Sequence, residues 1–515
     1  MTDELPEAFD LVVMGTGFTE SCIAAAASRI GKTVLHLDKN EYYGGDSWGS
    51  FSLDALCSLL EKEVSESSAL RNGSYTWHNV AAVNGDPEAP TAWTREAILA
   101  KSRRFNLDLC PRVLYAAGEL VQLLIRSNIC RYAEFRAVDH VCINNDGEIL
   151  SVPCSRSDVF NTKILTMVEK RLLMKFLMAC NDYGEDKCNE DSLAFRGRSF
   201  VEYLQAQRVT EKIALCVMQS IAMCGPNSTF EEGMQRTQRF LSSLGRYGNT
   251  PFLFPMYGCG ELPQCFCRLC AVFGGIYCLK RSVDAVSMDS QSQELLVSCE
   301  GKTLRAKHLV SAPGQVPIQP VAPMRPNISR GLFISYSPLG NEEINKGGGG
   351  VNLLRLLADG GAREAIVIQL SHYSGACPEG LYIFHITTPA QSEDPMADLA
   401  PFTSQIFQNI SQIVFSGYFT LYSTQSAEAN ALPLSIYCTS GPIYEIDYDA
   451  AISEAHRIFK ELYPNEEFLP RAPDPEEIVI DGEDPSALNE HSLPEDLRAQ
   501  LHDMEINPTE NQQTN

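Results

Sequence analysis

Gly15, Gly17 and Asp38 have the spacing of a nucleotide-binding site. In dinucleotide-binding proteins a glycine-rich turn lets the first helix direct its N-terminus at a pyrophosphate, and an acidic residue about 20 positions later binds the ribose. Asp38 follows Gly15 by 23 residues. This spacing indicates a turn of the kind that binds a dinucleotide.

The segments around this motif must form the elements that position it. Residues 9–14 are an apolar run that ends at the glycine turn, and residues 21–30 are mostly small residues over a helical length. Residues 33–37 are a second apolar, β-branched run that ends at Asp38. This order predicts a βαβ unit, and therefore an α/β fold of the Rossmann type that binds FAD or NAD(P).

The turn departs from the dinucleotide pattern at Glu20. The pattern Gly-x-Gly-x-x-Gly requires a third small residue so that the helix lies close to the strand, and Glu20 stands in that place. A carboxylate about 4 Å from a phosphate charge opposes binding by roughly 4 kcal/mol at an effective dielectric constant near 20, which is about a thousandfold in affinity. We therefore interpret Gly15, Gly17 and Glu20 as a degenerate dinucleotide turn and expect no bound cofactor. The alternative is a tolerated substitution in a flavin-binding oxidoreductase.

The composition of the 515-residue chain excludes several classes of protein. Hydrophobic residues make up 44% and charged residues 21% of the chain, which is typical of a folded protein with more than one domain. A net charge of −24 has the wrong sign for neutralising phosphate backbones, so we expect no nucleic-acid partner. An acidic start without an apolar signal segment, together with eighteen cysteines, favours the reducing cytosol.

The end of the chain is much more acidic than the rest. Residues 464–515 hold fourteen carboxylates and two arginines, a net charge of −12. Prolines and few large apolar residues accompany this charge, so we expect residues 471–515 to form an acidic, partly disordered tail.

Two long blocks of sequence carry a resemblance to a known family. The first is Asp38-Lys-Asn-Glu-Tyr-Tyr-Gly-Gly-Asp46, and the second runs over residues 245–278 and includes Gly-Glu-Leu-Pro-Gln-Cys-Phe-Cys-Arg-Leu-Cys. With the Gly-Thr-Gly-x-x-Glu turn, these blocks resemble the Rab GDP-dissociation inhibitors and Rab escort proteins, a family whose core is related to FAD-dependent oxidoreductases. Ser47-Trp-Gly-Ser-Phe-Ser52, the cysteines at 265–270 and the acidic tail favour the escort branch.

The resemblance implies a discontinuous arrangement of domains. Residues 1–110 and 225–470 are expected to form the α/β domain that binds Rab, with an all-helical domain inserted at residues 111–224. Within the insertion, helices are predicted over residues 109–129, 162–180, 199–207 and 211–223. Short apolar runs after residue 279 predict the strands of a mixed sheet, and residues 450–463 predict a closing helix.

Residues 261–273 show a two-sided helical pattern. Leu262, Phe266, Leu269 and Phe273 recur at steps of four and three, which predicts a buried stripe. The opposite stripe is Glu261, Gln264 and Arg268, and by its residues alone it can be a solvated face with an internal ion pair. The resemblance implies instead that these three residues bind Rab together with Tyr43, and that Cys278 lies at the same surface. The cysteines at 265, 267 and 270 point in different directions around the helix, so we expect packed thiols and no metal site.

For the inserted domain, the resemblance implies that it accepts the geranylgeranyl lipid of a bound Rab and docks the prenyltransferase. The family places an exposed phenylalanine at the transferase interface. Phe200 is the candidate for it, with a core position as the open alternative.

The expected function is therefore that of a carrier without catalytic residues. It would bind GDP-bound Rab GTPases, present them to the Rab geranylgeranyltransferase alpha/beta heterodimer, and shield the attached lipid during transient delivery to membranes. The alternatives are an inhibitor that recycles prenylated Rabs, and the FAD-dependent oxidoreductase named above.

Overall fold

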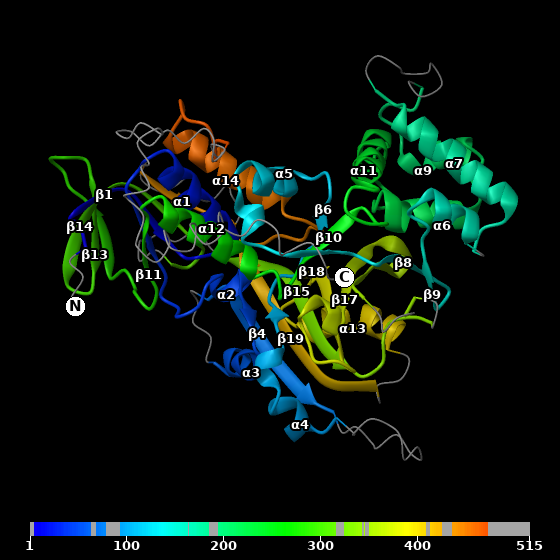
Figure 1. Cartoon of the computed structure of the whole chain (residues 1–515), viewed down its shortest axis with the longest axis horizontal. Coiled ribbons are helices and arrows are strands. Elements are labelled where there is room, and N and C mark those ends of the chain that lie inside the picture. The colour runs from blue at the N-terminus through cyan, green and yellow to red at the C-terminus, as the bar shows by residue number, and fades with distance from the viewer. Residues whose placement is uncertain are drawn as a thin grey trace, which may run out of the picture. The chain divides into compact units, whose positions relative to one another are not determined.

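The chain forms the predicted βαβ unit around the glycine turn (Figure 1). The computed structural model describes residues 5–62, 68–78, 93–162, 164–184, 194–315, 324–341, 344–345, 350–407, 412–424 and 435–471. β1 (Ala8–Met14) leads into α1 (Phe18–Arg29), and β2 (Val34–Leu37) then pairs with β1 in parallel. The sequence therefore predicted both the elements and their order.

β1 lies inside a larger sheet with the order β11-β2-β1-β14-β13-β12, in which β20 also pairs with β14. The added strands are β11 (Ile276–Cys278), β12 (Ala285–Met288), β13 (Leu295–Cys299), β14 (Lys302–Ser311) and β20 (Ile436–Cys438). α1 packs against α12 (Glu261–Val272) and α14 (Asp449–Leu462). The run Ala24 to Ala27 is fully buried in α1, and such small side chains allow neighbouring helices to approach closely.

A second sheet takes up most of the remaining strands, in the order β4-β19-β15-β18-β17-β16-β8-β9. Its strands are β4 (Leu70–Trp77), β8 (His140–Asn145), β9 (Glu148–Ser151), β15 (Arg325–Ser335), β16 (Asn352–Ala358), β17 (Arg363–Leu370), β18 (Tyr382–Pro389) and β19 (Ile413–Ser423). α13 (Pro395–Ile406) packs on this sheet. The strands and the closing helix predicted after residue 279 are confirmed, but the strands divide between the two sheets.

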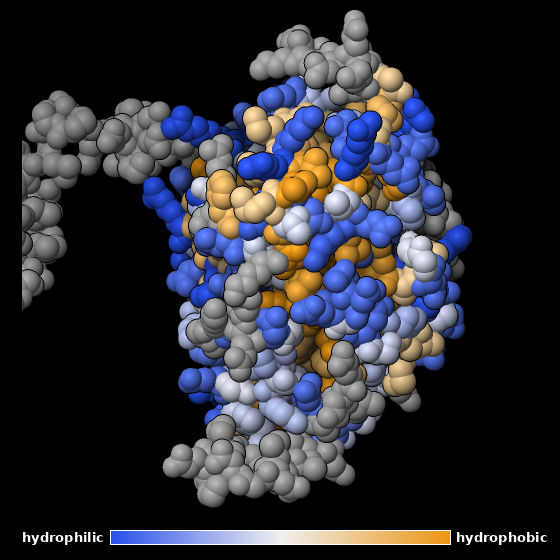
Figure 2. Space-filling model, turned by 90° about the vertical axis from the view of Figure 1, so that its right-hand side faces the viewer, coloured by the Kyte–Doolittle hydropathy of each residue, from blue (hydrophilic) through white to orange (hydrophobic). Residues whose placement is uncertain are grey.

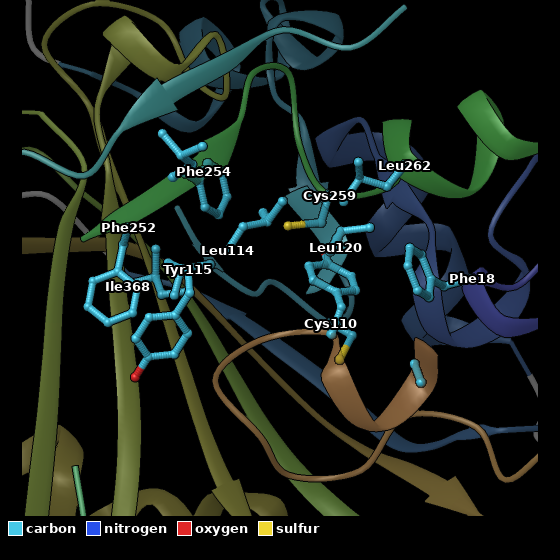
Figure 3. Packing of buried hydrophobic residues seen from close by; sticks show 14 of the residues in the cluster. Phe18, Cys110, Leu114, Tyr115, Leu120, Phe252, Phe254, Cys259, Leu262 and Ile368 are labelled. Carbon is cyan, nitrogen blue, oxygen red and sulfur yellow. The ribbon is translucent and has the colours of Figure 1, made fainter. Parts of the chain in front are cut away.

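Two small sheets and several short helices connect these layers. Their strands are β3 (Ser50–Phe51) with β5 (Leu107–Asp108), and β6 (Leu114–Tyr115) with β10 (Phe252–Pro255) and β7 (Phe135–Ala137). The helices are α2 (Gly45–Trp48), α3 (Leu53–Glu61), α4 (Arg95–Leu99) and α5 (Glu119–Arg126). Figure 3 shows how the core continues across this region, from Phe18 of α1 and Leu262 of α12, through Phe252 and Phe254 of β10, to Ile368 of the second sheet.

The inserted region differs from the all-helical prediction. Within residues 111–224 the structure describes α5, α6 (Arg156–Asn161), α7 (Met167–Asn181), α9 (Phe200–Ala206), α10 (Glu211–Cys216) and a π-helical turn (Val217–Ile221), and α11 (Phe230–Ser243) follows them. However, β6 to β9 lie within residues 111–224, and α11 lies beyond residue 224 although it packs on α7 and α9. We call the group from α6 to α11 the helical part.

The helix predicted over residues 109–129 forms only as α5, because distant segments hydrogen-bond to the residues before it, which form the short strand β6 and a turn instead. The backbone N–H of Val113 donates to the Ile446 carbonyl at 3.0 Å, and that of Ala116 donates to the Pro251 carbonyl at 2.9 Å. Pro111 supplies no N–H for a helix.

Residues 1–470 form one unit. The tail predicted at 471–515 lies outside the described residues, apart from Arg471. No helix in the described part of the chain has the length and apolar character needed to cross a membrane.

Candidate functional site

The glycine turn holds a buried carboxylate where a dinucleotide would bring its pyrophosphate. α1 begins after Gly17, and the Glu20 side chain turns back towards that residue. Its carboxylate lies so close to Gly17 that a Cβ atom added there would overlap it. Glu20 is buried and accepts a hydrogen bond from the Thr439 hydroxyl. Burial raises the pKa of Glu20 to about 7. The turn therefore has its own internal acid in place of a bound phosphate.

The acidic residue after β2 is also used within the protein. Asp38 is buried, and its Oδ2 accepts hydrogen bonds from the Thr16 N–H at 2.8 Å and from the Thr16 hydroxyl at 2.7 Å. Its Oδ1 accepts a further bond from the Asn40 N–H at 2.8 Å. These bonds occupy the acceptors that would otherwise bind a ribose.

Little space remains between the glycine turn, Trp48 and Gly441. The cavity there has a volume of about 20 Å³, enough for about one water molecule. The residues present therefore do not fit a dinucleotide, and the flavin-enzyme alternative has no site in this turn.

Tyr43 lies near α12, although more than 200 residues separate them in the sequence. Its ring meets the ring of Tyr277 edge to face, with 6.3 Å between centroids, and Tyr43 lies near the Cys267 thiol of α12. Tyr43 is half-buried, and burial raises its pKa. The next residue, Gly44, has φ +85°, and a Cβ atom there would lie 2.6 Å from the Gly49 nitrogen. Only glycine allows this tight turn beside the aromatic ring.

α12 has the two faces that the sequence predicted, with one exception. Leu262, Phe266 and Leu269 are buried, whereas Phe273 is 38% exposed. The Arg29 guanidinium carbon lies over the Phe273 ring, 4.4 Å from its centroid. Phe273 is exposed because the helix ends at Val272 and the chain turns away at Gly274.

The polar face of α12 is open to solvent. Gln264 and Arg268 are exposed, and Glu261 is half-buried, with its pKa raised by burial. The Arg268 guanidinium lies over the Tyr132 ring, 4.6 Å from its centroid. We define the platform as Tyr43, Glu261, Gln264 and Arg268.

The cysteines near the platform are packed thiols. Cys265, Cys267 and Cys270 are buried, and burial raises the pKa of Cys267 to about 12. Cys278 is half-buried on β11 and lies 3.7 Å from an Arg281 guanidinium nitrogen. Among the described residues, no group of three or more His, Cys, Asp or Glu side chains is placed to hold a metal.

The structure places Phe200 in the core, which corrects its assignment to an exposed interface. Phe200 is 0% exposed at the start of α9, and its ring lies against Gly233 of α11. Phe200 is therefore a core residue, which was the alternative left open by the sequence. The Phe200 ring fits into the core because Gly233 has no side chain. A Cβ atom at position 233 would overlap the ring.

A different phenylalanine of the helical part is exposed. Phe160 in α6 is 73% exposed, and its carbonyl accepts a hydrogen bond from Lys170 Nζ of α7 at 2.7 Å. Met167 and Val168 in the first turn of α7 are also exposed. The face that carries α6 and α7 shows hydrophobic patches among polar residues (Figure 2).

Helical periodicity contains a signal for this patch. Leu173, Phe176 and Cys180 form the buried stripe of α7. At about 100° per residue, Met167 and Val168 lie roughly 120° and 140° away from Leu173. Met167 and Val168 thus lie on the outward side of the first turn of α7, a signal that the assignment of Phe200 did not use.

Comparison with known proteins agrees with this fold and these motifs. The family described as "GDP dissociation inhibitor" matches residues 4–83 and 90–466. The chain belongs to the GDP dissociation inhibitor family. The resemblance read from the two sequence blocks is thereby confirmed.

Individual members of the GDP dissociation inhibitor family match over nearly the whole chain. The chain is 73% identical to a Drosophila melanogaster protein named "Rab proteins geranylgeranyltransferase component A", over 98% of both chains. It is 32% identical to the Homo sapiens "Rab proteins geranylgeranyltransferase component A 1", over 96% of this chain and 97% of that protein. The crystal structure of a Rab GDI from Plasmodium falciparum has a TM-score of 0.69 at 17% identity, covering 90% of this chain and all of that one, which shows the shared fold.

Proposed function

We propose that this chain is a Rab escort protein, an accessory and non-catalytic component of Rab geranylgeranyltransferase. It binds newly made Rab GTPases in the GDP form, presents them to the alpha/beta heterodimer of the transferase, and carries the prenylated Rab through the cytosol to membranes. The observation that carries the proposal is the 73% identity, over 98% of both chains, to a relative named as component A of this transferase.

The platform has the chemistry to capture the mobile switch loops of a GDP-bound GTPase. Arg268 offers a planar set of N–H donors for carboxylates and carbonyls, and Tyr132 below it limits its freedom. Tyr43 supplies an aromatic anchor held by Tyr277. Aromatic and arginine side chains often dominate the energy of protein interfaces. In this proposal Cys278 lies at the edge of the bound surface.

The helical part is proposed to dock the transferase and to accept the lipid. Phe160 in α6, and Met167 and Val168 at the start of α7, are exposed apolar side chains that a partner can cover. Aromatic rings fill the interior of the helical part, among them Phe176 and Phe200, whose ring centroids lie 6.4 Å apart. An isoprenoid must therefore separate the helices as it enters, and each buried CH₂-sized unit contributes about 0.8 kcal/mol towards that opening.

Reconstituted prenylation tests the proposal. Purified transferase heterodimer, a GDP-loaded Rab and labelled geranylgeranyl donor are combined with and without this chain, and lipid incorporation into Rab is measured. The proposal predicts incorporation only with the chain. Binding of prenylated Rab without support of prenylation would instead identify a recycling inhibitor. A stoichiometric flavin absorbance in the purified protein would contradict the carrier function.

A further inference from the structure

A buried hydrogen-bond cluster joins the two segments that supply the platform. Asp108 on β5 is 1% exposed, and its Oδ1 accepts hydrogen bonds from the Ser50 hydroxyl and from the Cys259 N–H, the latter at 2.8 Å. Ser50 Oγ in turn accepts a hydrogen bond from the Gly260 N–H at 2.8 Å. One carboxylate and one hydroxyl therefore bind the chain directly before α12, which begins at Glu261.

The shape of residues 258–260 depends on this contact. Gly258 has φ +106°, and a Cβ atom there would lie 2.8 Å from both Asp108 Oδ1 and Ser50 Oγ. A Cβ atom at Gly260 would lie 2.6 Å from Ser50 Oγ. The two glycines thus let the backbone pass over Ser50 at hydrogen-bond distance.

Ser50 is also connected to Tyr43 by a short and well-held segment. α2 spans Gly45–Trp48 between them, and the Trp48 N–H donates to the Gly44 carbonyl at 2.9 Å. The Trp48 ring packs on Phe18 with 5.6 Å between centroids. The Leu109 N–H donates to the Gly49 carbonyl at 3.0 Å, which fixes the end of the segment beside β5. Movement of Ser50 relative to Asp108 therefore changes the position of Tyr43 relative to α12.

The cluster is anchored to the second sheet by a buried arginine. Arg330 of β15 is 0% exposed, and its Nε donates to the Leu109 carbonyl at 2.8 Å. Another of its guanidinium nitrogens donates to the Ile386 carbonyl at 2.7 Å. The strand that carries Asp108 is thus held from both sides.

We propose that Ser50 and Asp108 are positioning residues for Rab binding, which set the spacing between Tyr43 and the start of α12. This inference rests on the proposed function of the platform. Neither side chain needs to touch the partner. Their role is to hold Tyr43, Glu261 and Arg268 in one arrangement before Rab arrives, so that binding does not have to order them.

The test compares Ser50→Ala with a control that loses an equally buried hydroxyl elsewhere. Ser329 on β15 is 0% exposed and donates to Asp398 Oδ2 at 2.6 Å. It precedes Arg330 on the strand, but successive side chains of a strand point to opposite faces, so Ser329→Ala removes a similar hydrogen bond without touching the cluster. Affinity for GDP-loaded Rab is measured at a temperature at which circular dichroism shows every variant folded. We expect Ser50→Ala to lower the affinity about tenfold, the scale of ordering one or two side chains, and Ser329→Ala to leave it within about twofold.

A second pair of variants separates positioning from general stability. Asp108→Asn keeps an Oδ1 acceptor for both donors and should retain the affinity, whereas Asp108→Ala should lose it. Hydrogen exchange at the Cys259 and Gly260 amides should accelerate in Ser50→Ala and Asp108→Ala only. Unchanged Rab affinity in Ser50→Ala, or an equal loss in Ser329→Ala, would overturn the inference. Failure of the wild-type chain to bind Rab would instead contradict the proposed function, and the inference with it.

Discussion

The Thr439 hydroxyl donates a hydrogen bond to the Glu20 carboxylate, although 419 residues separate the two in the sequence. Both side chains are buried, and they meet beside the glycine turn between β1 and α1. The residue that departs from the dinucleotide pattern is thus a structural acid with a dedicated partner. The buried Glu20 carboxyl is therefore a group that can titrate inside the protein core.

Glu20→Gln should change how stability depends on pH. Burial raises the pKa of Glu20 from 4.5 to about 7, so between these values the folded protein holds the proton more tightly than the unfolded chain. Its contribution to wild-type stability is therefore fully present below about pH 4.5 and is lost as pH rises to about 7. The glutamine variant does not titrate, so its stability relative to wild type should rise over this range, by up to about 3 kcal/mol. Urea unfolding at several pH values measures the difference.

The matched control for this titration is Glu379→Gln, at an exposed position. Urea unfolding of this variant over the same pH range measures the effect of losing one carboxylate at the surface. A pH-independent difference between Glu20→Gln and wild type would contradict the burial of a titrating Glu20.

Arg268→Ala should weaken Rab binding without unfolding the protein. The side chain is exposed and lies over Tyr132, so its loss should change the free energy of unfolding by less than about 1 kcal/mol. As a central arginine of an interface it should contribute about 2 kcal/mol or more to binding, roughly thirtyfold in affinity. Isothermal titration with GDP-loaded Rab measures the loss. Arg198→Ala, which removes an exposed arginine paired with Glu202 in the helical part, should bind Rab as wild type does. Equal Rab affinities for Arg268→Ala and Arg198→Ala would show that Arg268 does not contribute to Rab binding.

Phe160→Ala and Phe200→Ala should affect different properties of the protein, namely transferase binding and stability. Phe160 is exposed, so its truncation should leave thermal stability unchanged while weakening the transferase complex by about tenfold or more. Phe200 is fully buried, and its truncation should destabilise the protein by about 3 to 5 kcal/mol. Thermal unfolding and a pull-down with the transferase heterodimer separate the two roles. Full transferase binding by Phe160→Ala would show that the enzyme docks elsewhere.

Gly233→Ala should destabilise the helical part, although alanine is the better helix former in isolation. The added methyl group would overlap the Phe200 ring, and such overpacking costs about 1 to 3 kcal/mol. In a Phe200→Ala background the ring is absent, so the same substitution should be neutral or stabilising. A double-mutant cycle from denaturant unfolding gives the coupling energy, and independent effects of the two substitutions would disprove the contact.

Local patterns in the sequence determined the βαβ unit, the strands after residue 279 and the two faces of α12, because hydrophobic periodicity and turn residues act over a few neighbouring positions. They also identified Glu20 as the departure from a nucleotide site. Family motifs then indicated the platform, since they recur as long blocks of residues.

Only the tertiary structure decided which phenylalanine is exposed and how the platform is assembled. Phe160 and Phe200 both occur in short helices, and Phe200 is buried because α11 presents Gly233 to it. Residues 109–118 do not join the helix, because Val113 and Ala116 donate their N–H groups to the carbonyls of residues 446 and 251. Ser50, Asp108 and Gly260 meet across more than 200 residues of chain, and no local pattern encodes such a contact. Folding alone creates it, by bringing distant donors and acceptors together where water is excluded.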